Sequence, residues 1–119
     1  ETALPAIGRR IEEAAVGTRI TAIMAVAGPA DEQHFVTKAV LETHWLHRPL
    51  GAAASPTPLL AKLRDMPVPA GTFVWIAAEA QVARALRSHL LQDRNHPPGW
   101  MKAAGYWVEG RADTTEKFD

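Results

Sequence analysis

Apolar and polar positions along the chain follow two different periods, and these separate predicted strands from predicted helices. Residues 19–27 and 72–78 carry apolar side chains on both faces, which is typical of strands covered on both sides in a parallel sheet. Residues 37–47, where apolar and polar side chains mix, and residues 100–109 are also predicted to be strands. Helical spacing of apolar residues predicts three helices, at residues 3–15, 58–66 and 79–94.

The order of these elements is helix, strand, strand, helix, strand, helix, strand, which predicts an α/β domain with a mostly parallel sheet. The expected architecture is a Rossmann-like three-layer sandwich formed by residues 1–110, followed by a polar and flexible tail at 111–119. A doubly wound domain normally begins with a strand, whereas this chain begins at a helix. We therefore expect the first strand of the sheet to be missing from the chain.

Composition excludes several classes of function. The 13 basic and 13 acidic residues give a formal net charge of zero, so the basic surface of a nucleic-acid-binding protein is not expected. The absence of cysteine excludes disulfides, thiolate catalysis and cysteine-ligated metals, and the histidine spacing predicts no metal site. No apolar run has the length of a membrane span and no signal-peptide pattern is present, so a cytoplasmic location is expected.

Four blocks of sequence carry a family resemblance. They are ETALPAI at 1–7, WLHR at 45–48, VWIAAEA at 74–80 continued by ALRSHL at 85–90, and GYWVEG at 105–110. In this order, and over nearly the whole chain, they resemble the C-terminal NAD(P)H-binding domain of siderophore-interacting proteins. The family is ferredoxin-reductase-like, and its N-terminal barrel, which holds FAD, has no counterpart in these 119 residues.

The resemblance implies an FAD-dependent oxidoreductase that uses NADPH or NADH to reduce ferric siderophores. Electrons from the nicotinamide reach ferric iron through the flavin, and iron is released because siderophores bind iron(II) weakly. The flavin domain and a ferric siderophore are then partners of the full-length protein, and FAD is bound mainly outside this chain. The isolated chain is expected to be inactive.

The resemblance also implies a cofactor-binding set with no catalytic side chain: Glu1, Thr2, Ala3, Leu4, Trp45, His47, Arg48, Ala78, Glu79, Ala80, Tyr106 and Trp107. The first helix is expected to bind the pyrophosphate at its start, because free N–H groups and partial positive charge suit an anion. An ordinary helix capped by Thr2 is the structural alternative.

Trp45, His47 and Arg48 end a predicted strand, which is where open α/β sheets bind ligands. We hypothesise that Arg48 pairs with the 2′-phosphate of NADPH and so favours NADPH over NADH, with assistance from His47. The alternative is a solvated strand end in which Trp45 packs into the core.

The small residues around Glu79 are expected to leave room for the nicotinamide, and Glu79 either bonds the cofactor or stabilises the start of a helix. Tyr106 and Trp107 are implied to place an aromatic ring against the flavin or the nicotinamide, although tryptophan in a strand more often belongs to the core. His89 is expected at the surface or at an interface.

A rival function belongs to another class. A truncated α/β domain with an incomplete sheet is predicted to expose strand edges, and such edges pair with other chains. In this alternative the chain is an interaction module that forms a homodimer and has no activity alone.

Overall fold

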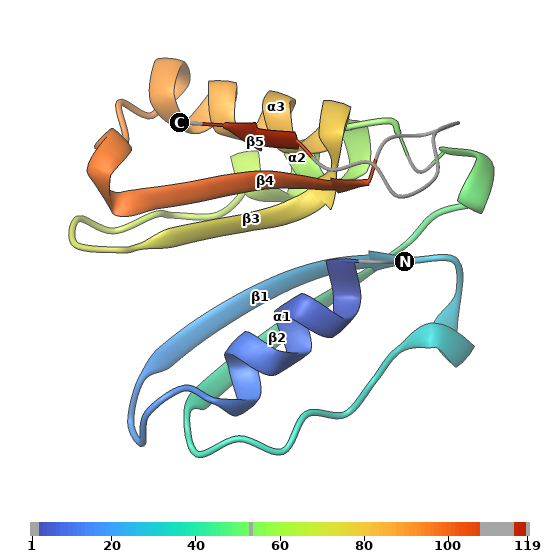
Figure 1. Ribbon diagram of the computed structural model, residues 1–119, viewed down its shortest axis with the longest axis vertical. Coiled ribbons are helices and arrows are strands. Elements are labelled where there is room, and N and C mark those ends of the chain that lie inside the picture. Colours follow the sequence, from blue (N-terminus) through green and yellow to red (C-terminus); the bar gives the residue numbers. More distant parts are fainter. Residues whose placement is uncertain (1–2, 53, 108–115, 119) are drawn as a thin grey trace. The chain divides into compact units, whose positions relative to one another are not determined.

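The computed structural model describes residues 3–52, 54–107 and 116–118, and Figure 1 shows the arrangement of its elements. The helices are α1 (Ala3–Glu12), α2 (Thr57–Arg64) and α3 (Ala80–Ser88), and the strands are β1 (Arg19–Val26), β2 (Val40–His47), β3 (Val74–Glu79), β4 (Met101–Trp107) and β5 (Glu116–Phe118). The α/β class and the predicted order of the first seven elements are confirmed. The strands form two small sheets, each containing a parallel pair.

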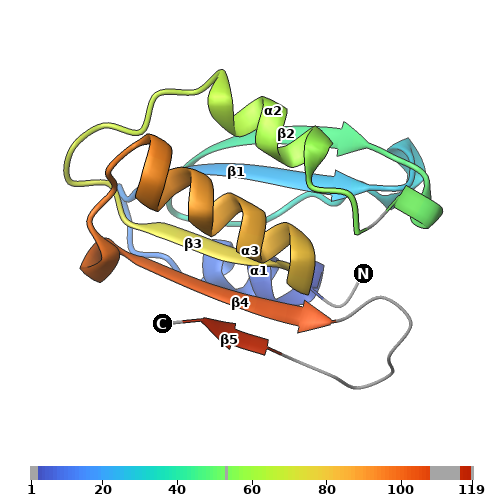
Figure 2. The same cartoon turned by 90° about the horizontal axis from the view of Figure 1, so that it is seen from above.

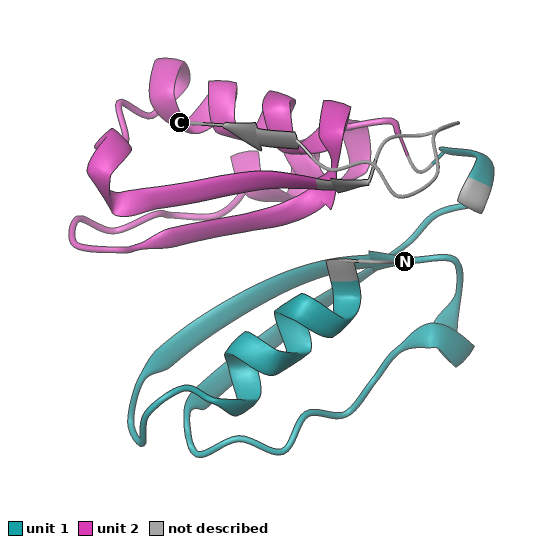
Figure 3. Cartoon of the chain, in the orientation of Figure 1, with its two compact units in different colours: residues 1–52 teal, residues 53–119 magenta. Residues whose placement is uncertain are grey.

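The chain divides into two compact units, Glu1–Ala52 and Ala53–Asp119, which Figure 3 distinguishes by colour. Unit 1 consists of α1 and the parallel strands β1 and β2, which pair in register from Arg19 opposite Val40 to Val26 opposite His47. No helix among the described residues of either unit is both long and apolar enough to cross a membrane.

The core of unit 1 lies between α1 and one face of the strand pair. Its buried members are Ile11, Ala22, Met24 and Phe35, and further apolar side chains from α1, β1 and β2 pack against them. Alternation along β1 directs Ala22 and Met24 to this face, while the spacing of Leu4, Ile7 and Ile11 gives α1 a matching apolar side. This packing fixes α1 against the strands.

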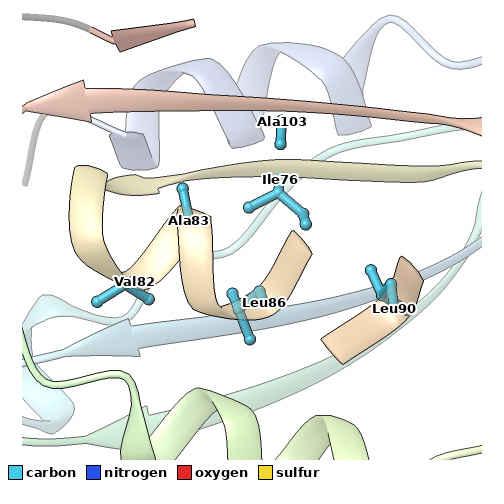
Figure 4. Close-up of a cluster of buried hydrophobic side chains, with 6 residues drawn as sticks. All are labelled: Ile76, Val82, Ala83, Leu86, Leu90 and Ala103. Atoms are coloured by element: carbon cyan, nitrogen blue, oxygen red, sulfur yellow. The ribbon is translucent and has the colours of Figure 1, made fainter. Parts of the chain in front are cut away.

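Unit 2 consists of the three-stranded sheet β3–β4–β5 with α2 and α3. Helix α3 lies along β3 and β4, as Figures 1 and 2 show from two directions. The buried core joins the sheet to α3 through Ile76, Val82, Ala83, Leu86, Leu90 and Ala103, which Figure 4 shows. Leucines of α2 pack against the same cluster. Arg94 donates a 2.6 Å hydrogen bond from Nη2 to the carbonyl of Leu63, near the end of α2.

The end of α3 differs from the sequence prediction. After Ser88 the helix continues as a single π-helical turn, His89–Asp93. The side chain of His89 is only 7% exposed, and its Nδ1 lies 3.0 Å from Oδ2 of Asp93. The predicted surface position of His89 is therefore wrong. The residue lies three positions after buried Leu86, and this spacing returns it to the inner side of a helix.

The polar tail contains a strand that the sequence analysis did not predict. Strand β5 pairs antiparallel with β4, with Phe118 opposite Ala103 and Glu116 opposite Gly105. The three described residues of the tail are thus paired with the sheet, so the prediction of a flexible tail is wrong for them. The other tail residues lie outside the described part of the chain.

Candidate functional site

The predicted site residues that the structure describes lie where parallel strands end, and they form one group in each unit. In unit 1, α1 runs antiparallel to β1, so that its first turn lies at the edge where β1 and β2 end (Figure 1). The backbone N–H groups of Ala3 and Leu4 have no partner within the helix, because a first turn has no preceding carbonyls. This end of α1 can therefore bind an anion.

The side chains near the start of α1 have mixed roles. Leu4 is half-buried and packs against the core of unit 1, so its apolar side chain helps to fix the helix. Ala3 is the first residue of α1. The predicted contacts of Glu1 and Thr2 lie outside the described residues, and the choice between an anion site and an ordinary capped helix stays a prediction.

The carboxyl end of β2 carries an imidazole paired with a carboxylate. His47 is the last residue of β2, and its Nε2 lies 2.5 Å from Oε2 of Glu32. Glu32 immediately follows the short helical turn Pro29–Asp31, which comes after β1. Glu32 is not among the site residues predicted from the sequence. An acidic residue after the strand that follows a nucleotide-binding helix was the signal that could have found it.

Trp45 is half-buried and Arg48 is buried. The rings of Trp45 and Phe35 are stacked, with centroids 6.2 Å apart and an interplanar angle of 11°. This contact supports the core role of Trp45. Arg48 continues the strand pairing through a 2.9 Å hydrogen bond from its backbone N–H to the carbonyl of Val26, and the residue is 7% exposed. Its role in selecting NADPH stays a prediction.

In unit 2, Glu79 stands between the end of β3 and the start of α3. Its Oε1 accepts hydrogen bonds from the backbone N–H groups of Gln81, at 2.6 Å, and Val82, at 3.3 Å. The residue is 1% exposed. Glu79 therefore caps α3, which confirms the structural alternative. Contact between Glu79 and a cofactor stays a prediction.

Ala80, one of the small residues beside Glu79, lies at a closely packed junction with β4. A Cβ placed on Gly105 of β4 would lie 2.8 Å from Cα and 2.9 Å from Cβ of Ala80. Ala80 is 2% exposed, and half-buried Ala78 packs against the core of unit 2. The size of Ala80 is thus explained by the close approach of α3 to β4, independently of any room for nicotinamide.

The remaining predicted site residues lie at the end of β4. Gly105 pairs with Ala78, and the register then shifts so that Trp107 pairs with Glu79. The backbones of Tyr106 and Trp107 therefore end at the same edge of the sheet as β3. The proposed stacking of their rings stays a prediction.

The chemistry of the unit 1 group suits binding. Among the residues that the structure describes, no cluster of three or more histidine, aspartate or glutamate side chains could hold a metal ion. The polar groups at the strand ends include helix N–H donors, a carboxylate and an imidazole. Such groups bind and orient a polar ligand without forming a covalent bond to it.

Comparison with known proteins identifies the class of protein. Residues 1–110 match the siderophore-interacting protein family. The chain is also similar to a solved structure described as a siderophore utilization protein from T. fusca, with 36% sequence identity and a TM-score of 0.77. The match covers 95% of this chain and 44% of that protein. The α/β strand arrangement described above is consistent with this neighbour.

The chain belongs to the siderophore-interacting protein family. Its similar proteins include uncharacterized proteins of Mycobacterium tuberculosis and Mycobacterium bovis, which are 29% identical over 123 residues. These matches cover 95% of this chain and 44% of each relative. The chain therefore spans less than half the length of the relatives that it matches.

Proposed function

We propose that the chain is the pyridine-nucleotide-binding domain of an FAD-dependent oxidoreductase that reduces ferric siderophores. Membership of the siderophore-interacting family is the observation that carries this proposal. The proposal includes a Rossmann-like three-layer sandwich, with FAD held mainly by another domain of the whole protein. Such an enzyme obtains its redox chemistry from NAD(P)H and FAD, and the protein supplies binding, orientation and electrostatics.

The described residues are suited to bind the nucleotide. The start of α1 offers N–H donors at the edge where β1 and β2 end, which suits a pyrophosphate. The start of α3 is already occupied by the carboxylate of Glu79. A second anion there would face that carboxylate. Of these two helix starts, α1 is therefore the better candidate for the pyrophosphate.

The substitution Ala3→Glu tests this assignment, because it affects helix stability and nucleotide binding in opposite directions. A negative charge in the first turn stabilises a helix by about 0.3–1 kcal/mol. The same charge would repel a pyrophosphate, and we expect the affinity for NAD(P)⁺ to fall about tenfold or more, which corresponds to at least about 1.4 kcal/mol. Isothermal titration calorimetry and urea denaturation measure the two effects.

Ala15→Glu is the matched control. It introduces the same charge at an exposed position beyond the other end of α1 and is expected to leave nucleotide affinity unchanged. Equal losses of affinity in both variants would show a general effect of charge and contradict the site. Failure of the unsubstituted intact protein to bind either nucleotide would contradict the proposed function itself.

One observation favours the rival interaction module. Strand β1 carries apolar side chains on both faces, yet within the described part of the chain it pairs only with β2. Its other edge is therefore available for pairing. Gel filtration with mass measurement separates the two functions: a tight dimer of residues 1–119 without nucleotide binding supports the interaction module, and a nucleotide-binding monomer opposes it.

A further inference from the structure

Glu32 and His47 come from two different segments of unit 1 that meet at the carboxyl edge of its strands. Glu32 follows β1 through the short turn Pro29–Asp31, and His47 ends β2. Two backbone hydrogen bonds define this turn, from Asp31 to the carbonyl of Gly28 at 3.0 Å and from Glu32 to the carbonyl of Pro29 at 3.2 Å. The position of the Glu32 backbone is therefore set by the turn.

The Glu32 side chain is held in place but remains accessible. The 2.5 Å contact between Nε2 of His47 and Oε2 of Glu32 restricts the carboxylate, while the side chains are 42% and 33% exposed respectively. A carboxylate offers about four acceptor positions on its two oxygens, and one imidazole occupies only one of them. Glu32 thus retains the capacity to accept hydrogen bonds from a ligand.

The chain order around Glu32 matches a general arrangement in dinucleotide sites. In such sites the pyrophosphate lies at a helix start, and an acidic residue after the following strand bonds the hydroxyl groups of the adenosine ribose. Here α1 is followed by β1, and β1 is followed by Glu32. An ionised carboxylate accepts bonds from the 2′-hydroxyl of NADH but repels the 2′-phosphate of NADPH.

We infer that Glu32, positioned by His47, selects the cofactor with an unmodified adenosine ribose, so that this domain prefers NADH to NADPH. The inference rests on the proposed function and replaces Arg48 as the determinant of cofactor preference. Arg48 is 7% exposed, whereas Glu32 presents a third of its side chain. His47 acts as a positioning residue: its bond to Glu32 fixes the carboxylate.

The test is calorimetric titration of the intact natural protein with NAD⁺ and NADP⁺. These have the same adenosine groups as NADH and NADPH, but they do not reduce the flavin. The measured quantity is the ratio of the two dissociation constants. The unsubstituted protein is expected to bind NAD⁺ more tightly. Glu32→Gln is expected to shift the ratio toward NADP⁺ by about tenfold or more, the effect expected for loss of a bond to a charged group.

Three further variants define the origin of the shift. Asp31→Asn removes the same charge one residue earlier, from a side chain for which no contact with His47 is described, and should leave the ratio unchanged. His47→Leu releases the carboxylate and should shift the ratio in the same direction as Glu32→Gln but less. His47→Gln keeps an N–H donor and should restore most of the preference.

The outcomes separate the inference from the proposed function. If the unsubstituted protein prefers NADP⁺, or if Glu32→Gln leaves the ratio unchanged, the inference is overturned while nucleotide binding stands. A shift in Asp31→Asn without one in Glu32→Gln also overturns it. If neither nucleotide binds to the unsubstituted protein, the proposed function fails. A loss of folding would weaken both affinities together and would not produce the expected change in their ratio.

Discussion

Helix α3 approaches strand β4 closely at two small residues. Gly105 of β4 faces the backbone of Ala80 at the start of α3, with no room for a methyl group between them. We expect Gly105→Ala to lower the free energy of unfolding by about 1–3 kcal/mol, because the neighbouring atoms are backbone and cannot move aside easily. Urea denaturation followed by circular dichroism measures this loss.

Gly99→Ala provides the control for this prediction. A Cβ at Gly99 would meet no atom within 4 Å, and the residue has no positive φ angle. Its substitution is therefore expected to change stability by less than about 0.5 kcal/mol. Equal stability of the Gly105→Ala variant and the unsubstituted chain would contradict the close packing of α3 against β4.

At the scale of single residues, the sequence predicted positions better than roles. It placed Glu79 at the boundary of a strand and a helix, but could not choose between a cap and a cofactor contact. The hydrogen bonds to Gln81 and Val82 now show that its side chain caps α3, while contact with a cofactor stays a prediction. Glu32 was missed because its pairing with His47 spans fifteen residues of chain.

At the scale of elements, the cap on α3 yields a second prediction. Replacing Glu79 by alanine leaves the N–H groups of Gln81 and Val82 without their acceptor in a region where Glu79 itself is 1% exposed. We expect a loss of about 1–2 kcal/mol in the free energy of unfolding. The glutamine variant keeps an acceptor oxygen and should lose less. Urea midpoints of both variants, compared with that of the unsubstituted chain, provide the measurement.

A readout of binding distinguishes this cap from a direct cofactor contact. If Glu79 acts through α3 alone, Glu79→Gln should retain most of the nucleotide affinity under conditions where the protein is folded. Strong loss of affinity in a stably folded glutamine variant would instead support the contact with carboxamide or ribose. An alanine variant as stable as the unsubstituted chain would contradict the cap.

The elements themselves were largely predictable, because long apolar patterns define helices and buried strands. All seven predicted elements are present, and their bounds differ from the predictions by a few residues. The pairing of the strands was harder to predict from the sequence. Strand β5 is three residues long, too short for a period to be recognised, and the register shift between Ala78 and Glu79 leaves no pattern in the sequence.

At the scale of the whole molecule, the net charge of the chain bears on where a siderophore would be recognised under the proposed function. The chain has a formal net charge of zero, whereas recognition of an anionic iron chelate favours positive charge. The matches cover only 44% of each relative, so most of the relatives' length lies outside the matched region. Under the proposed function, we therefore expect siderophore recognition to lie mainly outside these 119 residues.

This expectation predicts different siderophore affinities for residues 1–119 and for the intact protein. Residues 1–119 alone should show no measurable affinity for a ferric siderophore in fluorescence titration, whereas the intact protein is expected to bind it. Affinity of the intact protein should fall with rising salt, because exposed charge interactions are screened. Tight and salt-sensitive binding by residues 1–119 alone would contradict the assignment.

The contact between Ala80 and Gly105 has a consequence for natural variation. A side chain at position 105 cannot fit while Ala80 stays in place, because its Cβ would lie 2.8 Å from Cα of Ala80. A larger residue at position 105 would therefore have to push the first turn of α3 outward, carrying the adjoining Glu79 with it. In homologues with other residues at this junction, the ends of β3 and β4 should therefore differ in shape, even where the residues that contact a ligand are the same.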